Sequence, residues 1–118
     1  MLMRKLLRGY VLAAAAGGLI TAVAITAARA DDGKANYDKN CVACHGAAGK
    51  GDGAAAKMLK PPPQDFGTAL KGKSDADIAK VIKEGGKAVG KSPAMPAYGS
   101  KLSDDQIKGI VDYIKGLK

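Results

Sequence analysis

The sequence predicts a small all-α domain, and three observations support that prediction. Two segments, over 74–84 and 103–117, place apolar residues at helical spacing after a serine and acidic residues. No stretch shows the pattern of a convincing β-strand. Stretches rich in glycine and proline separate the candidate helices, as expected for loops. A single domain built from a few helices is therefore expected.

Residues 1–30 are predicted to be a cleaved signal peptide, which leaves one domain over 31–118. A positively charged start is followed by an uncharged run of 20 residues from Gly9 to Ala28, and Ala28-Arg29-Ala30 supplies a small-x-small cleavage site. A retained membrane anchor is the alternative, because 20 residues approach the length that spans a bilayer. With cleavage, we expect a periplasmic chain that is not attached to a membrane.

Removal of this segment also changes the charge. The whole chain has 19 Lys and Arg residues, 11 Asp and Glu residues and a net charge of +8. Four of the basic residues lie in the first thirty positions, so residues 31–118 carry +4, and all of their strongly basic residues are lysines. These lysines are interspersed with acids, and aromatic residues are few, so nucleic-acid binding is not expected.

The first half of the mature chain is expected to hold one helix, a loop and a short helix. Asp32 could cap a helix that runs through Tyr37 into the cysteines at 41 and 44. Four glycines in 46–53 indicate a loop. A short helix is expected over 54–59, and three consecutive prolines at 61–63 stop it.

The second half is expected to hold two clearer helices. One begins at Ser74, presents Ile78, Val81 and Ile82 on one face, and ends at Gly85-Gly86. A loop with Pro93, Pro96 and Gly99 follows. A capping box at 103–106 starts the last helix, whose apolar stripe we expect to face the core: Ile107, Ile110, Val111, Ile114 and Leu117.

Both cysteines and the only histidine of the chain lie within five positions, in Cys41-Val42-Ala43-Cys44-His45. A disulfide would close a very small loop, a thioredoxin-like pair belongs with alternating strands and helices, and a structural zinc site needs a fourth ligand. The pattern C-x-x-C-H is instead the attachment site of c-type haem. We expect Cys41 and Cys44 to bond one covalent haem c through thioethers, with His45 as the proximal iron ligand. A haem-free metal-binding C-x-x-C protein is an alternative.

From position 33 to the end, the chain resembles the class I monohaem cytochromes c of small bacterial, periplasmic type. The resemblance covers nearly the whole mature chain and is carried by "CVACHG" at 41–46, "GKGDG" at 49–53, "KPPPQDF" at 60–66, "MPAYGSKLSDDQI" at 95–107 and "VDYIKGL" at 111–117. It implies the cytochrome c fold: three main helices, with loops wrapped around one haem and the first and last helices crossing. Gly109 would permit a close approach at that crossing.

The resemblance implies that Met95, in the loop "SPAMPAYG", is the distal iron ligand. No second histidine exists, and Met58 is the only other methionine after residue 30. Met58 is expected to fill a gap in the core. A ligand other than Met95 (Met58 or a lysine) and an open sixth site are the alternatives.

The resemblance also points to contacts around the haem. His45 is expected to donate its second ring N–H to the carbonyl of Pro61 or Pro62, which would fix the orientation of the imidazole. Tyr98 and Lys101 are candidates for bonding the haem propionates.

With both axial positions filled, the iron offers no place for a substrate, so an electron-transfer protein is predicted rather than an enzyme. The expected partners are redox proteins: a reductase, a dehydrogenase or a terminal oxidase. A cytochrome subunit dedicated to one periplasmic dehydrogenase and a haem-based sensor are alternatives. Eight lysines could steer the protein toward acidic partners: Lys50, Lys57, Lys60, Lys71, Lys73, Lys87, Lys91 and Lys101.

Overall fold

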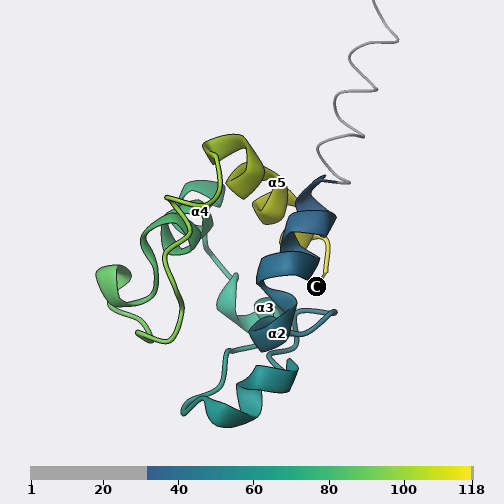
Figure 1. The fold of residues 1–118 in the computed structure, drawn as a ribbon, viewed down its shortest axis with the longest axis vertical. Coiled ribbons are helices and arrows are strands. Elements are labelled where there is room, and N and C mark those ends of the chain that lie inside the picture. Colours follow the sequence, from purple (N-terminus) through teal and green to yellow (C-terminus); the bar gives the residue numbers. More distant parts are fainter. Residues whose placement is uncertain (1–31, 118) are drawn as a thin grey trace, which may run out of the picture.

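The computed structural model describes residues 32–117, which form helices joined by loops (Figure 1). No β-strand occurs in this part of the chain, so the all-α prediction is confirmed. The predicted signal peptide at 1–30 lies outside the described residues. The elements are a helix over 32–40, α2 (Val42–His45), η1 (Ala54–Met58), α3 (Phe66–Ala69), α4 (Asp75–Glu84), η2 (Lys87–Val89) and α5 (Asp104–Lys115), where η marks a 3-10 helix.

Both of the later long helices start at a serine whose side chain satisfies a free backbone N–H. The Ser103 hydroxyl accepts from the N–H of Gln106, and the Gln106 side chain accepts from the Ser103 N–H, so the predicted capping box is confirmed. Ser74 and Asp77 form the same reciprocal pair at the start of α4. These two helices pack against each other.

The helix over 32–40 packs closely against α5, as the predicted crossing of first and last helices requires (Figure 1). A Cβ placed on Gly33 would lie 2.2 Å from the carbonyl oxygen of Gly109, so no other residue fits at 33 without displacing backbone. Gly109 was expected to permit this approach. The structure adds that Gly33 is its counterpart on the first helix.

The core lies where these three helices meet. The side chains of Tyr37, Ile110 and Val111 are at most 1% exposed. The Tyr37 hydroxyl donates a hydrogen bond of 2.5 Å to the carbonyl of Gly46, and burial raises the pKa of this tyrosine. The predicted stripe on the last helix is confirmed as core, except that its last member, Leu117, is only partly buried.

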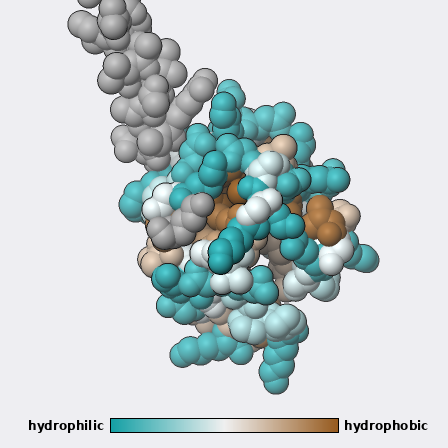
Figure 2. All heavy atoms as spheres, turned by 180° about the vertical axis from the view of Figure 1, so that it is seen from behind, coloured by the Kyte–Doolittle hydropathy of each residue, from teal (hydrophilic) through white to brown (hydrophobic). Residues whose placement is uncertain are grey.

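The surface shows one departure from expectation. Met58 is 85% exposed, so the expectation that it fills a gap in the core is wrong. Ala56 is the buried residue of η1, and the side chain of Met58 points to solvent. The face drawn in Figure 2 is mostly hydrophilic, with small hydrophobic areas between the polar side chains. Within residues 32–117, no helix is long and apolar enough to cross a bilayer.

Candidate functional site

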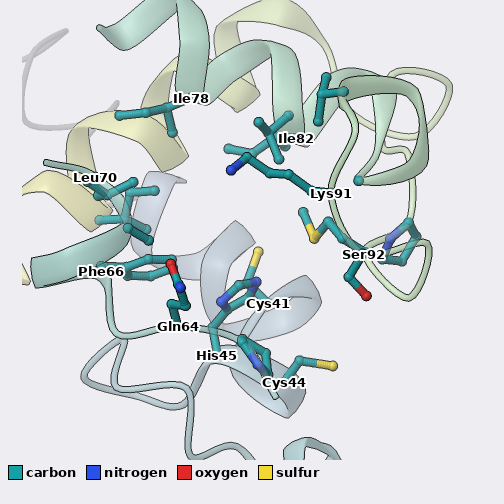
Figure 3. Close-up of a pocket in the computed structure, with 18 of the residues that line it drawn as sticks. Cys41, Cys44, His45, Gln64, Phe66, Leu70, Ile78, Ile82, Lys91 and Ser92 are labelled. Atoms are coloured by element: carbon teal, nitrogen blue, oxygen red, sulfur yellow. The ribbon is translucent and has the colours of Figure 1, made fainter. Parts of the chain in front are cut away.

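A cavity of about 710 Å³ opens between the N-terminal helices, α4 and the loop after α4 (Figure 3). Its size falls in the range of ordinary cofactor pockets, roughly 300–1,000 Å³. Cys41, Cys44, His45 and Met95 all line it, so the structure brings the four predicted site residues to one cavity. Most of the other lining residues are apolar, and they include Leu59, Pro61, Pro62, Phe66, Leu70, Ile78, Val81, Ile82, Ile110 and Ile114.

One wall of the cavity is the turn that carries the cysteines and the histidine. The N–H of Cys41 donates to the carbonyl of Tyr37, and the N–H of His45 donates to the carbonyl of Cys41, so the chain stays coiled through the motif. The loop that follows satisfies two carbonyls at the end of this turn. The N–H of Gly53 donates to the carbonyl of Cys44, and the N–H of Gly51 donates to the carbonyl of His45. This turn therefore fixes both thiols and the imidazole as one unit.

The imidazole of His45 is held against an aromatic ring. Its centroid lies 5.0 Å from that of Phe66, with the two rings 24° from parallel. Burial lowers the pKa of His45, which favours the neutral imidazole that can ligate a metal. Its Nδ1 is buried and has no hydrogen-bond partner. The expected hydrogen bond to Pro61 or Pro62 is therefore not made, and both prolines line the cavity instead.

Met95 comes from the loop that follows α4, and backbone hydrogen bonds tie this loop to the end of that helix. The Met95 carbonyl accepts from the N–H of Gly86, and the N–H of Tyr98 donates to the carbonyl of Ile82, both at 2.9 Å. A Cβ on Gly86 would lie 1.9 Å from the carbonyl oxygen of Ser92, so only glycine allows the loop to fold back so closely. The thioether of Met95 is half-buried against the core.

The two side chains expected at the propionates are used elsewhere. Tyr98 lines the cavity, but its hydroxyl donates to the carbonyl of Asn40 at 2.9 Å. This bond joins the loop that carries Met95, here called the distal loop, to the helix over 32–40. Burial raises the pKa of Tyr98, so the hydroxyl stays protonated and keeps that bond. Lys101 is not among the lining residues, and its ammonium lies 5.9 Å from the centroid of the Tyr98 ring.

The sequence did not reveal that several residues of the hydrophobic core also line the cavity. Ile78, Ile82, Ile110 and Ile114 belong to the buried core and also face the cavity. Helical periodicity marks such residues only as buried, because it cannot tell packing against protein from packing against a cofactor. The signal that was available was the small supply of large apolar side chains in a short mature chain, which calls for a cofactor to complete the core.

The donor set fits covalent haem attachment better than a bound metal ion. Within residues 32–117, no three His, Cys, Asp or Glu side chains gather closely enough to hold a metal ion. Both cysteines are free, and burial followed by the nearby Cys44 raises the pKa of Cys41 to about 11, so Cys41 is a neutral thiol at neutral pH. Two thiols three residues apart on the wall of an apolar cavity match the haem attachment pattern.

The residues present therefore fit a haem. The cavity has the volume and the apolar walls that a porphyrin needs, the thiols can anchor it, and an imidazole and a thioether are available to iron. Within residues 32–117, the Nδ1 of His45 is the one buried side-chain nitrogen or oxygen without a hydrogen-bond partner.

Comparison with known proteins agrees with this geometry. A family model described as "Cytochrome C oxidase, cbb3-type, subunit III" matches residues 28–114. The chain is 36% identical over 91 residues to the Cbb3-type cytochrome c oxidase subunit CcoP of Azospirillum brasilense. The aligned region covers 77% of this chain and 29% of that subunit. It is 34% identical to cytochrome c6 of Microcystis aeruginosa, over 70% of this chain and 90% of that protein. With cytochrome c6 of Gloeothece citriformis it shares 31% identity over 95% of this chain and 93% of that protein.

The chain thus spans under a third of the CcoP subunits it matches but nearly the full length of these cytochromes c6. It belongs to the class I c-type cytochromes, with a small monohaem domain and a covalently bound haem c. It is therefore a haem-based electron-transfer protein.

Proposed function

We propose that this cytochrome is a periplasmic single-electron carrier in which Cys41 and Cys44 hold the haem and His45 and Met95 are its axial ligands. The observation that supports the proposal most directly is that all four side chains line one apolar cavity, although Met95 lies fifty residues from His45 in sequence. When bound, haem supplies a ferric–ferrous couple that takes up and releases one electron.

The protein's part is to position and shield the ligands. The turn at 41–45 holds His45 beside the two thiols, and Phe66 stacks on its ring and limits its rotation. The hydrogen bonds from Gly86 and Tyr98 hold the Met95 loop against the end of α4, where Met95 lines the cavity. With haem bound, thioether ligation by Met95 would raise the reduction potential, and apolar walls that exclude water would do the same.

The proposed compartment depends on the N-terminal segment. Cleavage after Ala30 would release a chain that starts at Asp31 into the periplasm. Mass spectrometry of the protein from a periplasmic extract tests this directly. A mass that begins at residue 31 supports cleavage, and a full-length protein in the membrane fraction supports the retained anchor.

Redox proteins are the proposed partners, and a terminal oxidase or a dehydrogenase would serve. Of the eight lysines expected around the haem, Lys73 and Lys91 line the cavity, and Lys80 joins them. All three are exposed, so Lys73 and Lys91 can attract an acidic partner surface at low ionic strength, whereas Lys80 lies 4.0 Å from Glu84, which offsets its charge. Lys50 lies 3.3 Å from Asp65, which offsets its charge.

A second candidate is a cytochrome that stays attached to a larger catalytic assembly. The relationship to CcoP subunits favours this candidate, because the matching portion there is one part of a longer oxidase subunit. Co-purification of a stoichiometric catalytic chain would support it. Isolation of this cytochrome as a single protein that exchanges electrons at a salt-dependent rate would support a diffusing carrier.

An optical spectrum of the purified protein, oxidised and then reduced, tests the ligand proposal. Sharp c-type bands on reduction and a weak near-infrared sulfur-to-iron band on oxidation are the expected result. Haem bands without the sulfur band, together with carbon monoxide binding to the reduced protein, would indicate an open sixth site and favour a sensor. Absence of a Soret band would reject haem.

A further inference from the structure

Three lysines line the cavity, and Lys91 is the one that comes from the loop before Met95. Lys91 lines the cavity, and Figure 3 shows its amine nitrogen directed inward, toward Ile82 and Cys41. Its backbone is fixed, because the N–H of Lys91 donates to the carbonyl of Gly86 at 2.7 Å. No ion pair within residues 32–117 involves Lys91.

The one acidic side chain that lines the cavity is already engaged. The carboxylate of Asp77 accepts from the backbone N–H of Ser74 at 3.1 Å. Hydrogen bonds with Ser74, and then the nearby charges of Lys73 and Lys80, hold the pKa of Asp77 below its usual value. Asp77 is therefore balanced by Lys73 and Lys80, the other two lysines that line the cavity, and of the three only Lys91 has no effect on this carboxylate.

An ammonium beside apolar walls is tolerated while water fills the space. A cofactor that fills the cavity displaces this water, and the ammonium must then pair with an anion or turn outward, because an unpaired charge in an apolar site is costly. The two propionates of haem are the carboxylates that arrive with the cofactor.

We infer that Lys91 pairs with a haem propionate and so acts as a positioning residue for the cofactor, in place of Tyr98 and Lys101. The inference rests on the haem site proposed above. The pair neutralises one negative charge near the iron, which stabilises the ferrous state and raises the reduction potential.

The test compares Lys91→Gln with Lys91→Arg and with Lys87→Gln in the haem-loaded protein. Lys87 is a matched control, because it is an exposed lysine in η2, four residues before Lys91, and does not line the cavity. Lys91→Gln should lower the ferrous-to-ferric ratio at a given potential roughly three- to tenfold. A tenfold change corresponds to a reduction potential lower by about 59 mV for a one-electron couple. It should also shift the propionate carboxylate bands in redox-difference infrared spectra. Lys91→Arg should restore both readouts, and Lys87→Gln should change neither.

Two results would overturn the inference. In one, Lys91→Gln changes potential and carboxylate bands no more than Lys87→Gln does. In the other, Lys91→Gln alters the axial-ligand spectrum, which would mean that the amine binds iron. If the near-infrared sulfur band persists in every variant, the proposed electron-carrier function stands whether or not Lys91 meets a propionate.

Discussion

The two sides of the cavity are built in different ways. On one side, Cys41, Cys44 and His45 follow one another in a single helical turn, and local hydrogen bonds fix their positions. On the other side, Met95 lies in a loop that depends on distant parts of the chain, because Tyr98 bonds to Asn40, 58 residues away. The first wall is encoded locally, and the second exists only when the tertiary fold is complete.

The largest effect should come from removing the two thiols of the turn at 41–45. Replacing Cys41 and Cys44 together with serine should abolish covalent haem and leave a largely unfolded chain, since the core isoleucines would then border an unfilled cavity. Haem staining on a denaturing gel and far-ultraviolet circular dichroism measure the two losses. A double variant that keeps covalent haem would contradict the attachment site.

Removing the distal ligand should have a large effect on the iron and leave the haem attached. Met95→Ala should abolish the near-infrared sulfur-to-iron band, open the reduced protein to carbon monoxide and destabilise the fold by about 2–5 kcal/mol. Met58→Ala is the matched control. Because Met58 is 85% exposed, its loss should change the free energy of unfolding by less than about 0.5 kcal/mol and leave the spectrum intact. The reverse pattern would assign the ligand to Met58.

A smaller effect is expected where the distal loop turns back on α4. Gly86→Ala places a methyl group 1.9 Å from a backbone oxygen, so the loop must shift at a cost of about 1–3 kcal/mol. The sulfur-to-iron band should then disappear at a lower temperature than global unfolding. Gly116→Ala, whose Cβ would come no nearer than 3.3 Å to another atom, serves as control. Equal behaviour of the two variants would show that the turn at 86 does not hold the ligand.

The smallest effect should follow from loss of one hydrogen bond between the two walls. Tyr98→Phe removes the donor to the Asn40 carbonyl, which should cost about 1 kcal/mol. The melting of the sulfur-to-iron band should move more than the melting of the helices, because the bond anchors the distal loop. A shift confined to global unfolding would mean that Tyr98 only packs in the core.

The same contrast explains what the sequence could predict. The helices, the capping box at Ser103 and the contiguous haem motif depend on neighbours in sequence, and the structure confirms the elements. The role of Tyr98 and the exposure of Met58 depend on which segments meet, and local patterns do not carry that information. The short helix α3 was also missed, because four residues around a glycine show no periodicity.

The hydrogen bond expected for the Nδ1 of His45 is another feature that the sequence could not predict. A turn of three prolines could be read from the sequence, but the directions of its carbonyls could not. Both Pro61 and Pro62 face the cavity, and the imidazole nitrogen has no partner. The positions of backbone groups in irregular segments follow from tertiary packing rather than from residue type.

X-ray absorption at the iron edge of the oxidised protein tests the central claim most directly. The claim is that the folded chain brings His45 and Met95 to one iron from two walls, one encoded locally and one that depends on the tertiary fold. Ligation by His45 and Met95 predicts one sulfur scatterer at bonding distance beside the nitrogen shell, present in wild type and in Met58→Ala and absent in Met95→Ala. A shell of nitrogen or oxygen alone in the wild type, or a sulfur that survives Met95→Ala, would contradict it.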